Sequence, residues 1–107
     1  MFYHITPARN LKNIKTEGLI PSYDGSGVLG KGVFLYDEEG LEFSKMHALS
    51  QSGAQYSLLQ VVLPQGCTVD SKRLGFGSSI YEIYVARCPI PPCNLKYLGQ
   101  LKDMMDI

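Results

Sequence analysis

The sequence has no excess of charge of either sign and no long apolar run. Ten basic and ten acidic residues give a formal net charge of zero, and the basic residues are scattered along the chain. A clustered basic patch would indicate binding to nucleic acid or to a membrane surface, so neither partner is favoured. No apolar stretch approaches the roughly 20 residues that span a bilayer, and the N-terminus does not resemble a secretory signal. We therefore expect a cytoplasmic protein, in the producing cell or in a target cell.

Cysteine is scarce, and its arrangement does not suggest a metal site. Cys67, Cys88 and Cys93 form an odd set with no Cys-x-x-Cys pair and no histidine nearby, so no zinc site is expected. Cys88 and Cys93 bracket a rigid proline-rich run that a disulfide could bridge, but a reducing compartment would keep these thiols free. We expect free thiols, with Cys67 a small buried residue in a turn rather than a nucleophile.

The length of the chain limits it to one core. Its 107 residues, 45% of them hydrophobic, can bury one hydrophobic core but hardly two. No internal repeat or low-complexity segment is present. The sequence predicts a single domain over residues 1–107.

The first half of the chain combines strand and helix patterns. Residues 2–5 predict a strand, after which Thr6 and Pro7 supply the N-cap and first position of a helix that ends at Gly18. Residues 21–32 contain four glycines and predict an irregular loop. A short strand at 33–36 then leads to Asp37, which caps a second helix ending near residue 53.

The second half changes to a strand pattern. Apolar and alternating runs predict strands at 56–63, 68–69, 80–87 and 95–101, separated by turns. Strands this dense after two helices predict an α+β domain with a mostly antiparallel sheet rather than alternating βαβ units.

Three segments carry residues suited to chemistry. The glycines of Gly30–Gly32 let the backbone approach a ligand closely, although a turn entering a strand is the simpler interpretation. His4 shares a strand face with Thr6, which suits hydrogen bonding to a sugar hydroxyl, whereas a histidine with a structural role is the alternative. Glu82 has mostly apolar neighbours in its strand, a placement common at functional sites unless that strand is an exposed edge.

The order of the motifs resembles the ADP-ribosyltransferase superfamily, and most closely the catalytic domain of poly(ADP-ribose) polymerases. The matching segments are Tyr3–Thr6, Asn10–Leu19, Gly30–Leu35, Tyr81–Tyr84 and Asn94–Leu98. The resemblance implies a compact fold with a mostly antiparallel split β-sheet and two short helices. It also implies an enzyme that cleaves the nicotinamide–ribose bond of its co-substrate NAD and transfers the ADP-ribose unit.

The resemblance implies a role for each matching residue. In the triad of His4, Phe34 and Glu82, the histidine binds a ribose of NAD and Phe34 packs on nicotinamide in place of the usual tyrosine. The Glu82 carboxylate would stabilise the positive charge that develops on the sugar, without a metal ion. The residues implied in NAD binding are His4, Ile5, Thr6, Gly32, Phe34, Tyr36 and Ser44.

Departures from the family pattern narrow the expected function. Ile80 stands where arginine-modifying relatives carry Glu or Gln, and the chain is too short for the helical regulatory subdomain of polymerases. We expect transfer of a single ADP-ribose to a macromolecular acceptor, protein rather than nucleic acid.

Two alternatives to this function stay open. The first is a catalytically weak module that binds NAD, ADP-ribose or a protein partner, which the phenylalanine at position 34 favours. The second is an RNA 2′-phosphotransferase, which requires several arginines at its phosphate site. This chain has only Arg9, Arg73 and Arg87, and none of them lies in the strand motifs that carry the triad.

Overall fold

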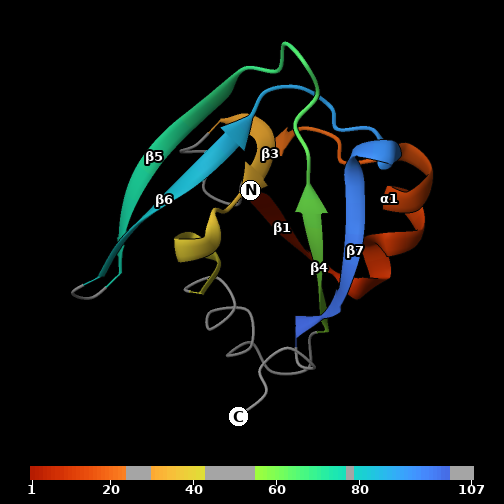
Figure 1. The fold of residues 1–107 in the computed structure, drawn as a ribbon, viewed down its shortest axis with the longest axis horizontal. Coiled ribbons are helices and arrows are strands. Elements are labelled where there is room, and N and C mark those ends of the chain that lie inside the picture. Colours follow the sequence, from red (N-terminus) through yellow and green to blue (C-terminus); the bar gives the residue numbers. More distant parts are fainter. Residues whose placement is uncertain (24–29, 43–54, 77–78, 102–107) are drawn as a thin grey trace.

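The computed structural model describes residues 1–23, 30–42, 55–76 and 79–101, and the strands in these ranges form two antiparallel sheets. One sheet has the order β1 (Phe2–Pro7), β4 (Tyr56–Val61) and β7 (Leu95–Gln100). The other has the order β2 (Ser22–Tyr23), β3 (Lys31–Leu35), β6 (Ser79–Ala86) and β5 (Val69–Phe76). Figure 1 shows the β5–β6 hairpin on one side and β1, β4, β7 and α1 on the other. The α+β class and the mostly antiparallel sheets are therefore as predicted.

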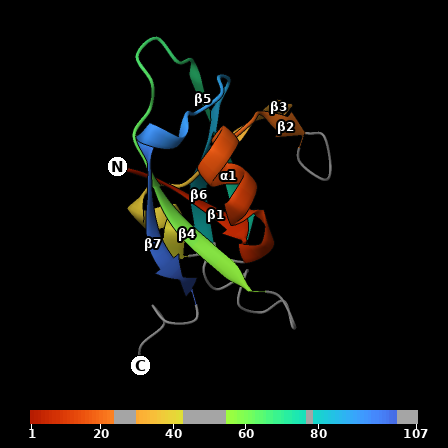
Figure 2. The same ribbon diagram turned by 90° about the vertical axis from the view of Figure 1, so that its right-hand side faces the viewer.

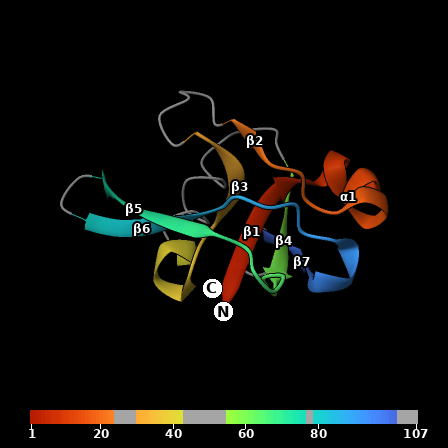
Figure 3. The ribbon, with the colours of Figure 1, turned by 90° about the horizontal axis from the view of Figure 1, so that it is seen from above.

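The two sheets meet where β1 passes beside the end of β3. Tyr3 and Tyr36 exchange two backbone hydrogen bonds there, of 2.8 and 2.9 Å between N and O. Seen from above, the hairpin and the β1–β4–β7 sheet extend in different directions from this point (Figure 3). The segment that carries His4 is thereby brought beside the segment that carries Phe34.

The first helix begins later than the sequence predicts. Pro7 has φ −56° and ψ 139°, so β1 continues through it, and a 3₁₀ turn at Ala8–Asn10 precedes helix α1 at Leu11–Glu17. Thr6 is therefore not the N-cap. Its hydroxyl instead accepts a hydrogen bond of 3.4 Å from the Asn10 side chain. A second 3₁₀ turn, Pro92–Asn94, precedes β7.

The end of helix α1 is as predicted. Gly18 has a positive φ of 79°, and its N–H donates to the carbonyl of Ile14 at 2.8 Å. A Cβ atom at this position would collide with the carbonyl oxygen of Ile90. Glycine is required here both by the backbone conformation and by this close approach.

Two other predicted segments differ from the structure. Ser22–Tyr23 and Lys31 belong to strands, so the predicted loop at 21–32 is shorter, and its residues 24–29 lie outside the described ranges. Asp37 does cap a helical segment at 38–42, because its Oδ1 accepts a 2.8 Å hydrogen bond from the N–H of Gly40. The rest of the predicted second helix, including Ser44, lies outside the described residues.

Strand β5 is longer than its sequence pattern indicates. The predicted strand at 68–69 extends as Val69–Phe76, and each of its residues pairs with β6, from Val69 opposite Ala86 to Phe76 opposite Ser79. Its residues 70–73 are polar and Gly75 lies near its end, so the usual apolar signal is absent. Pairing with the more apolar β6 supplies the order that its own composition does not predict.

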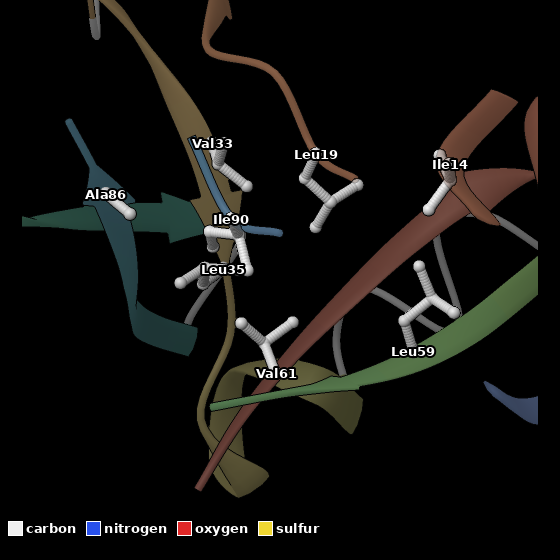
Figure 4. Packing of buried hydrophobic residues seen from close by; sticks show 8 residues of the cluster. All are labelled: Ile14, Leu19, Val33, Leu35, Leu59, Val61, Ala86 and Ile90. Atoms are coloured by element: carbon white, nitrogen blue, oxygen red, sulfur yellow. The ribbon is translucent and has the colours of Figure 1, made fainter. Parts of the chain in front are cut away.

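The main core lies between the two sheets and α1. Ile14 of α1 packs toward Leu59 of β4, while Leu19, Val33, Leu35, Val61, Ala86 and Ile90 complete the cluster (Figure 4). Figure 2 shows α1 in front of the strands that it covers. A smaller cluster of Leu41, Leu58 and Leu101 lies on the other face of β1 and β4. These clusters fix β1, β3 and α1 relative to one another.

The prediction of free thiols is wrong for two of the three cysteines. Cys67 and Cys88 form a disulfide, whereas Cys93 is free and exposed. The two cysteines are 21 residues apart in the chain, but the β5–β6 hairpin brings them together at its open end. A disulfide is typical of oxidising compartments, so these cysteines do not favour the cytoplasmic location expected above. Among the helices of the described residues, none is long and apolar enough to cross a membrane.

Candidate functional site

A hollow of about 260 Å³ lies beside His4, where β1 and β3 diverge below α1. Strand β1 contributes His4 and Thr6 to its wall, and β3 contributes Gly32 and Phe34. A face of α1 and the turn before it closes another side with Asn10, Asn13 and Glu17. The hollow thus collects polar side chains from segments that are far apart in the sequence.

The His4 imidazole is held in one orientation. Its Nδ1 lies 2.8 Å from the carbonyl oxygen of Phe34, and a carbonyl only accepts, so Nδ1 carries the hydrogen. Burial lowers the pKa of His4, and the hydrogen bond to Phe34 opposes this shift only in part. The ring is therefore neutral near pH 7, with Nε2 left as a hydrogen-bond acceptor.

The lowered pKa of His4 predicts a stability that depends on pH. Below the ordinary pKa of 6.5 the unfolded chain binds a proton before the folded chain does. The stabilisation is thus complete above pH 6.5 and decreases as the pH falls toward the folded-state pKa, by at most about 1.4 kcal/mol per pH unit. Urea unfolding of the wild type and of His4→Gln at pH 7.5, 6.5 and 5.5 measures the difference. Parallel curves for the two proteins would contradict the assignment of a buried neutral ring.

Gly32 is explained by packing as well as by ligand approach. It is buried, and a Cβ atom there would clash with the side chain of Val85 on β6. The absence of a side chain therefore lets β3 lie close against β6 while its backbone also borders the hollow.

Ile5 and Tyr36 lie on the other side of β1 from the hollow. Both pack against the cluster of Leu41, Leu58 and Leu101, and neither side chain lines the hollow. Both residues were implied in NAD binding by the resemblance, but neither contributes its side chain to this wall.

Glu82 lines a second depression, of about 440 Å³, together with Asp37, Glu39, Arg73, Ile80 and Tyr84. Its Oε1 is 3.5 Å from Nε of Arg73 on the paired strand β5, and its side chain is 36% exposed. The hydroxyl of Tyr84 donates to Oδ2 of Asp37 at 3.0 Å. Hydrogen bonding to the Glu82 and Asp37 carboxylates raises the pKa of Tyr84 to about 12. Tyr84 therefore remains a hydrogen-bond donor at any physiological pH.

The structure brings together two members of the predicted triad and separates the third. His4 and Phe34 share the first hollow, whereas Glu82 lies three positions along β6 from Val85, the partner of Phe34. Three residues of strand correspond to about 10 Å. Side chains alternate along β6, so Glu82 shares the face of Tyr84 and its partner Leu35, opposite to that of Phe34. Neither of these two hollows is lined by all three residues.

The polar residues of α1 and of the turn before it were not among the predicted site residues. Asn10, Asn13 and Glu17 recur at spacings of three and four, which places them on one helical face. In the sequence, this segment was predicted to form a helix and matched the family pattern, but its polar face was assigned no role. Its polar face was an available signal for a second wall of the site.

Comparison with protein-family models, with curated proteins and with solved structures found no match to this chain. In the described ranges, no group of three or more His, Cys, Asp or Glu side chains is placed to hold a metal ion.

Proposed function

We propose that this chain is an NAD-dependent mono-ADP-ribosyltransferase that binds NAD in the hollow beside His4. The main support is the hydrogen bond from His4 to the Phe34 carbonyl, which joins two residues of the proposed triad at the junction of a split, mostly antiparallel sheet. The proposal takes the finer fold to be that of the ADP-ribosyltransferases.

The hollow offers groups that suit a nucleoside. The free Nε2 of His4 accepts a hydrogen bond from a sugar hydroxyl, and Thr6 adds a hydroxyl to the same wall. Its volume of 260 Å³ is slightly below the roughly 300–1,000 Å³ of typical ligand pockets. One nucleoside of the dinucleotide would occupy the hollow, and the remainder would extend beyond it.

The proposal assigns the catalytic carboxylate to Glu82. Breaking the nicotinamide–ribose bond develops positive charge on the sugar, which a carboxylate stabilises. The ion pair between Glu82 and Arg73 is long and exposed to solvent. Breaking it so that Glu82 can contact a substrate therefore costs little free energy. Catalysis then requires the nicotinamide ribose to reach the Glu82 side of the sheet.

A second candidate is a module that binds NAD or ADP-ribose without efficient catalysis. The separation of Glu82 from the hollow favours it, and Phe34 lacks the hydroxyl of the usual tyrosine. The RNA 2′-phosphotransferase gains no support, because the described wall of the hollow contains no arginine or lysine.

Calorimetry with NAD tests the binding that both candidates share. We expect His4→Ala to weaken NAD binding by about tenfold, the equivalent of one lost hydrogen bond of about 1.4 kcal/mol. Thr16→Ala is the matched control, because the Thr16 hydroxyl bonds the Lys12 carbonyl and lies outside the hollow. Incubation with labelled NAD and cell lysate then separates a transferase, which labels an acceptor, from a binding module, which does not. If the wild type binds no NAD, both candidates are wrong.

A further inference from the structure

We propose that Glu17 and Asn13 bind the vicinal hydroxyls of a ribose of NAD and so select dinucleotides in which that ribose is unsubstituted. This inference rests on the proposed binding of NAD in the hollow. It adds two specificity-determining residues on α1 that the family resemblance does not assign.

The two side chains line the hollow and have no partner among the described residues. Asn10, on the same face, already donates a hydrogen bond of 3.4 Å from its side-chain amide to the Thr6 hydroxyl. Asn13 and Glu17 both line the hollow, yet in the described part of the chain neither side chain makes a hydrogen bond or ion pair. Their hydrogen-bonding capacity is thus available to a ligand.

The chemistry of this pair matches a diol and disfavours a phosphate. An ionised carboxylate only accepts hydrogen bonds and has two oxygens for two hydroxyl donors, while an amide both donates and accepts. No arginine or lysine of the described residues lines the hollow to neutralise a phosphate. Glu17 also ends α1, where the helix dipole is negative. A phosphate on the bound ribose would meet uncompensated negative charge.

Packing fixes the position of this wall. Ile14, between Asn13 and Glu17 on the helix, is buried in the main core. Directly after Glu17, Gly18 packs on the carbonyl of Ile90, and Leu19 exchanges two backbone hydrogen bonds of 2.9 Å with Ile90. The backbone that carries Glu17 is therefore held in place, so that only its exposed side chain has to be ordered when a ligand binds.

A cycle of protein and ligand changes tests the inference. Calorimetry compares NAD with two analogues, one lacking the 2′-hydroxyl of the adenosine ribose and one lacking that of the nicotinamide ribose. We expect one analogue to bind the wild type about tenfold more weakly than NAD, because a hydrogen bond to a charged group is lost. The analogue that is affected identifies the ribose.

In Glu17→Ala that tenfold penalty should disappear, whereas in the control Glu38→Ala, which removes a carboxylate outside both hollows, it should persist. If the adenosine ribose is the one bound, NADP should also bind the wild type more weakly than NAD, and Glu17→Ala should reduce the difference. An unchanged penalty in Glu17→Ala, or no penalty for either analogue, would overturn the inference while NAD binding stands. Absence of any NAD binding to the wild type would overturn the proposed function together with it.

Discussion

Replacing Glu82 by glutamine is expected to slow the cleavage of NAD by about 100- to 1,000-fold, the loss typical when one electrostatic stabiliser of a transition state is removed. The substitution keeps the size of the side chain and removes its negative charge. The partly exposed contact of Glu82 with Arg73 contributes little to stability, so the variant should fold. Release of nicotinamide under single-turnover conditions at saturating NAD measures the chemical step.

Glu39→Gln is the matched control for this experiment. Glu39 lines the same depression, so its substitution makes the same change in charge close to Glu82 without removing the proposed catalytic group. The control should cleave NAD at nearly the wild-type rate. Equal rates for the wild type and Glu82→Gln would remove the carboxylate from the mechanism, and tight binding without cleavage by either would favour the binding module.

Removing the disulfide by the double substitution Cys67→Ala/Cys88→Ala is expected to lower the free energy of unfolding by about 3 kcal/mol. The bond closes a loop between residues 21 apart, so it restricts the unfolded chain substantially. It also holds the open end of the β5–β6 hairpin, beside the 2.8 Å bond from the Arg87 N–H to the Thr68 carbonyl. For a domain of this size the loss corresponds to a decrease in Tm of more than about 10 °C.

Thermal and urea unfolding without reductant measure this effect, and Cys93→Ala is the control. Cys93 is exposed and forms no disulfide, so its replacement should leave the free energy of unfolding within about 0.5 kcal/mol of the wild type. Alkylation of the native protein followed by mass spectrometry should modify one cysteine only. Modification of all three, or a double variant as stable as the wild type, would contradict the pairing.

The strands with apolar sequence patterns were predicted, and the exceptions have identifiable causes. Strands β1, β3, β4, β6 and β7 carry apolar or alternating residues, whereas β5 is ordered by its partner rather than by its own composition. Pro7 is compatible with both a first helical position and an extended strand, and the structure has the strand. The disulfide depends on the hairpin, which no spacing of cysteines in the sequence shows.

The sequence indicated which residues of β1 and β3 line the hollow, but it did not indicate how the predicted site residues are arranged in space. His4 and Phe34 come together because β1 and β3 lie side by side. The position of Glu82 depends on the register of β6 against β3, because a shift by one residue would move its side chain to the other face. Register is set by packing across the whole sheet, which a motif of four residues does not contain.

The sparse connection between the two sheets affects how ligand preference can change. In the described residues, β1 and β3 share backbone hydrogen bonds only at Tyr3 and Tyr36, so no continuous ladder sets the width of the space between them. Buried residues support the wall of the hollow instead, such as Ile90, which is fully enclosed and exchanges backbone hydrogen bonds with the lining residue Leu19. Enlarging or trimming such a residue is expected to resize the hollow without altering a single group that lines it. The ligand preference proposed for this hollow could therefore change through a substitution in the interior.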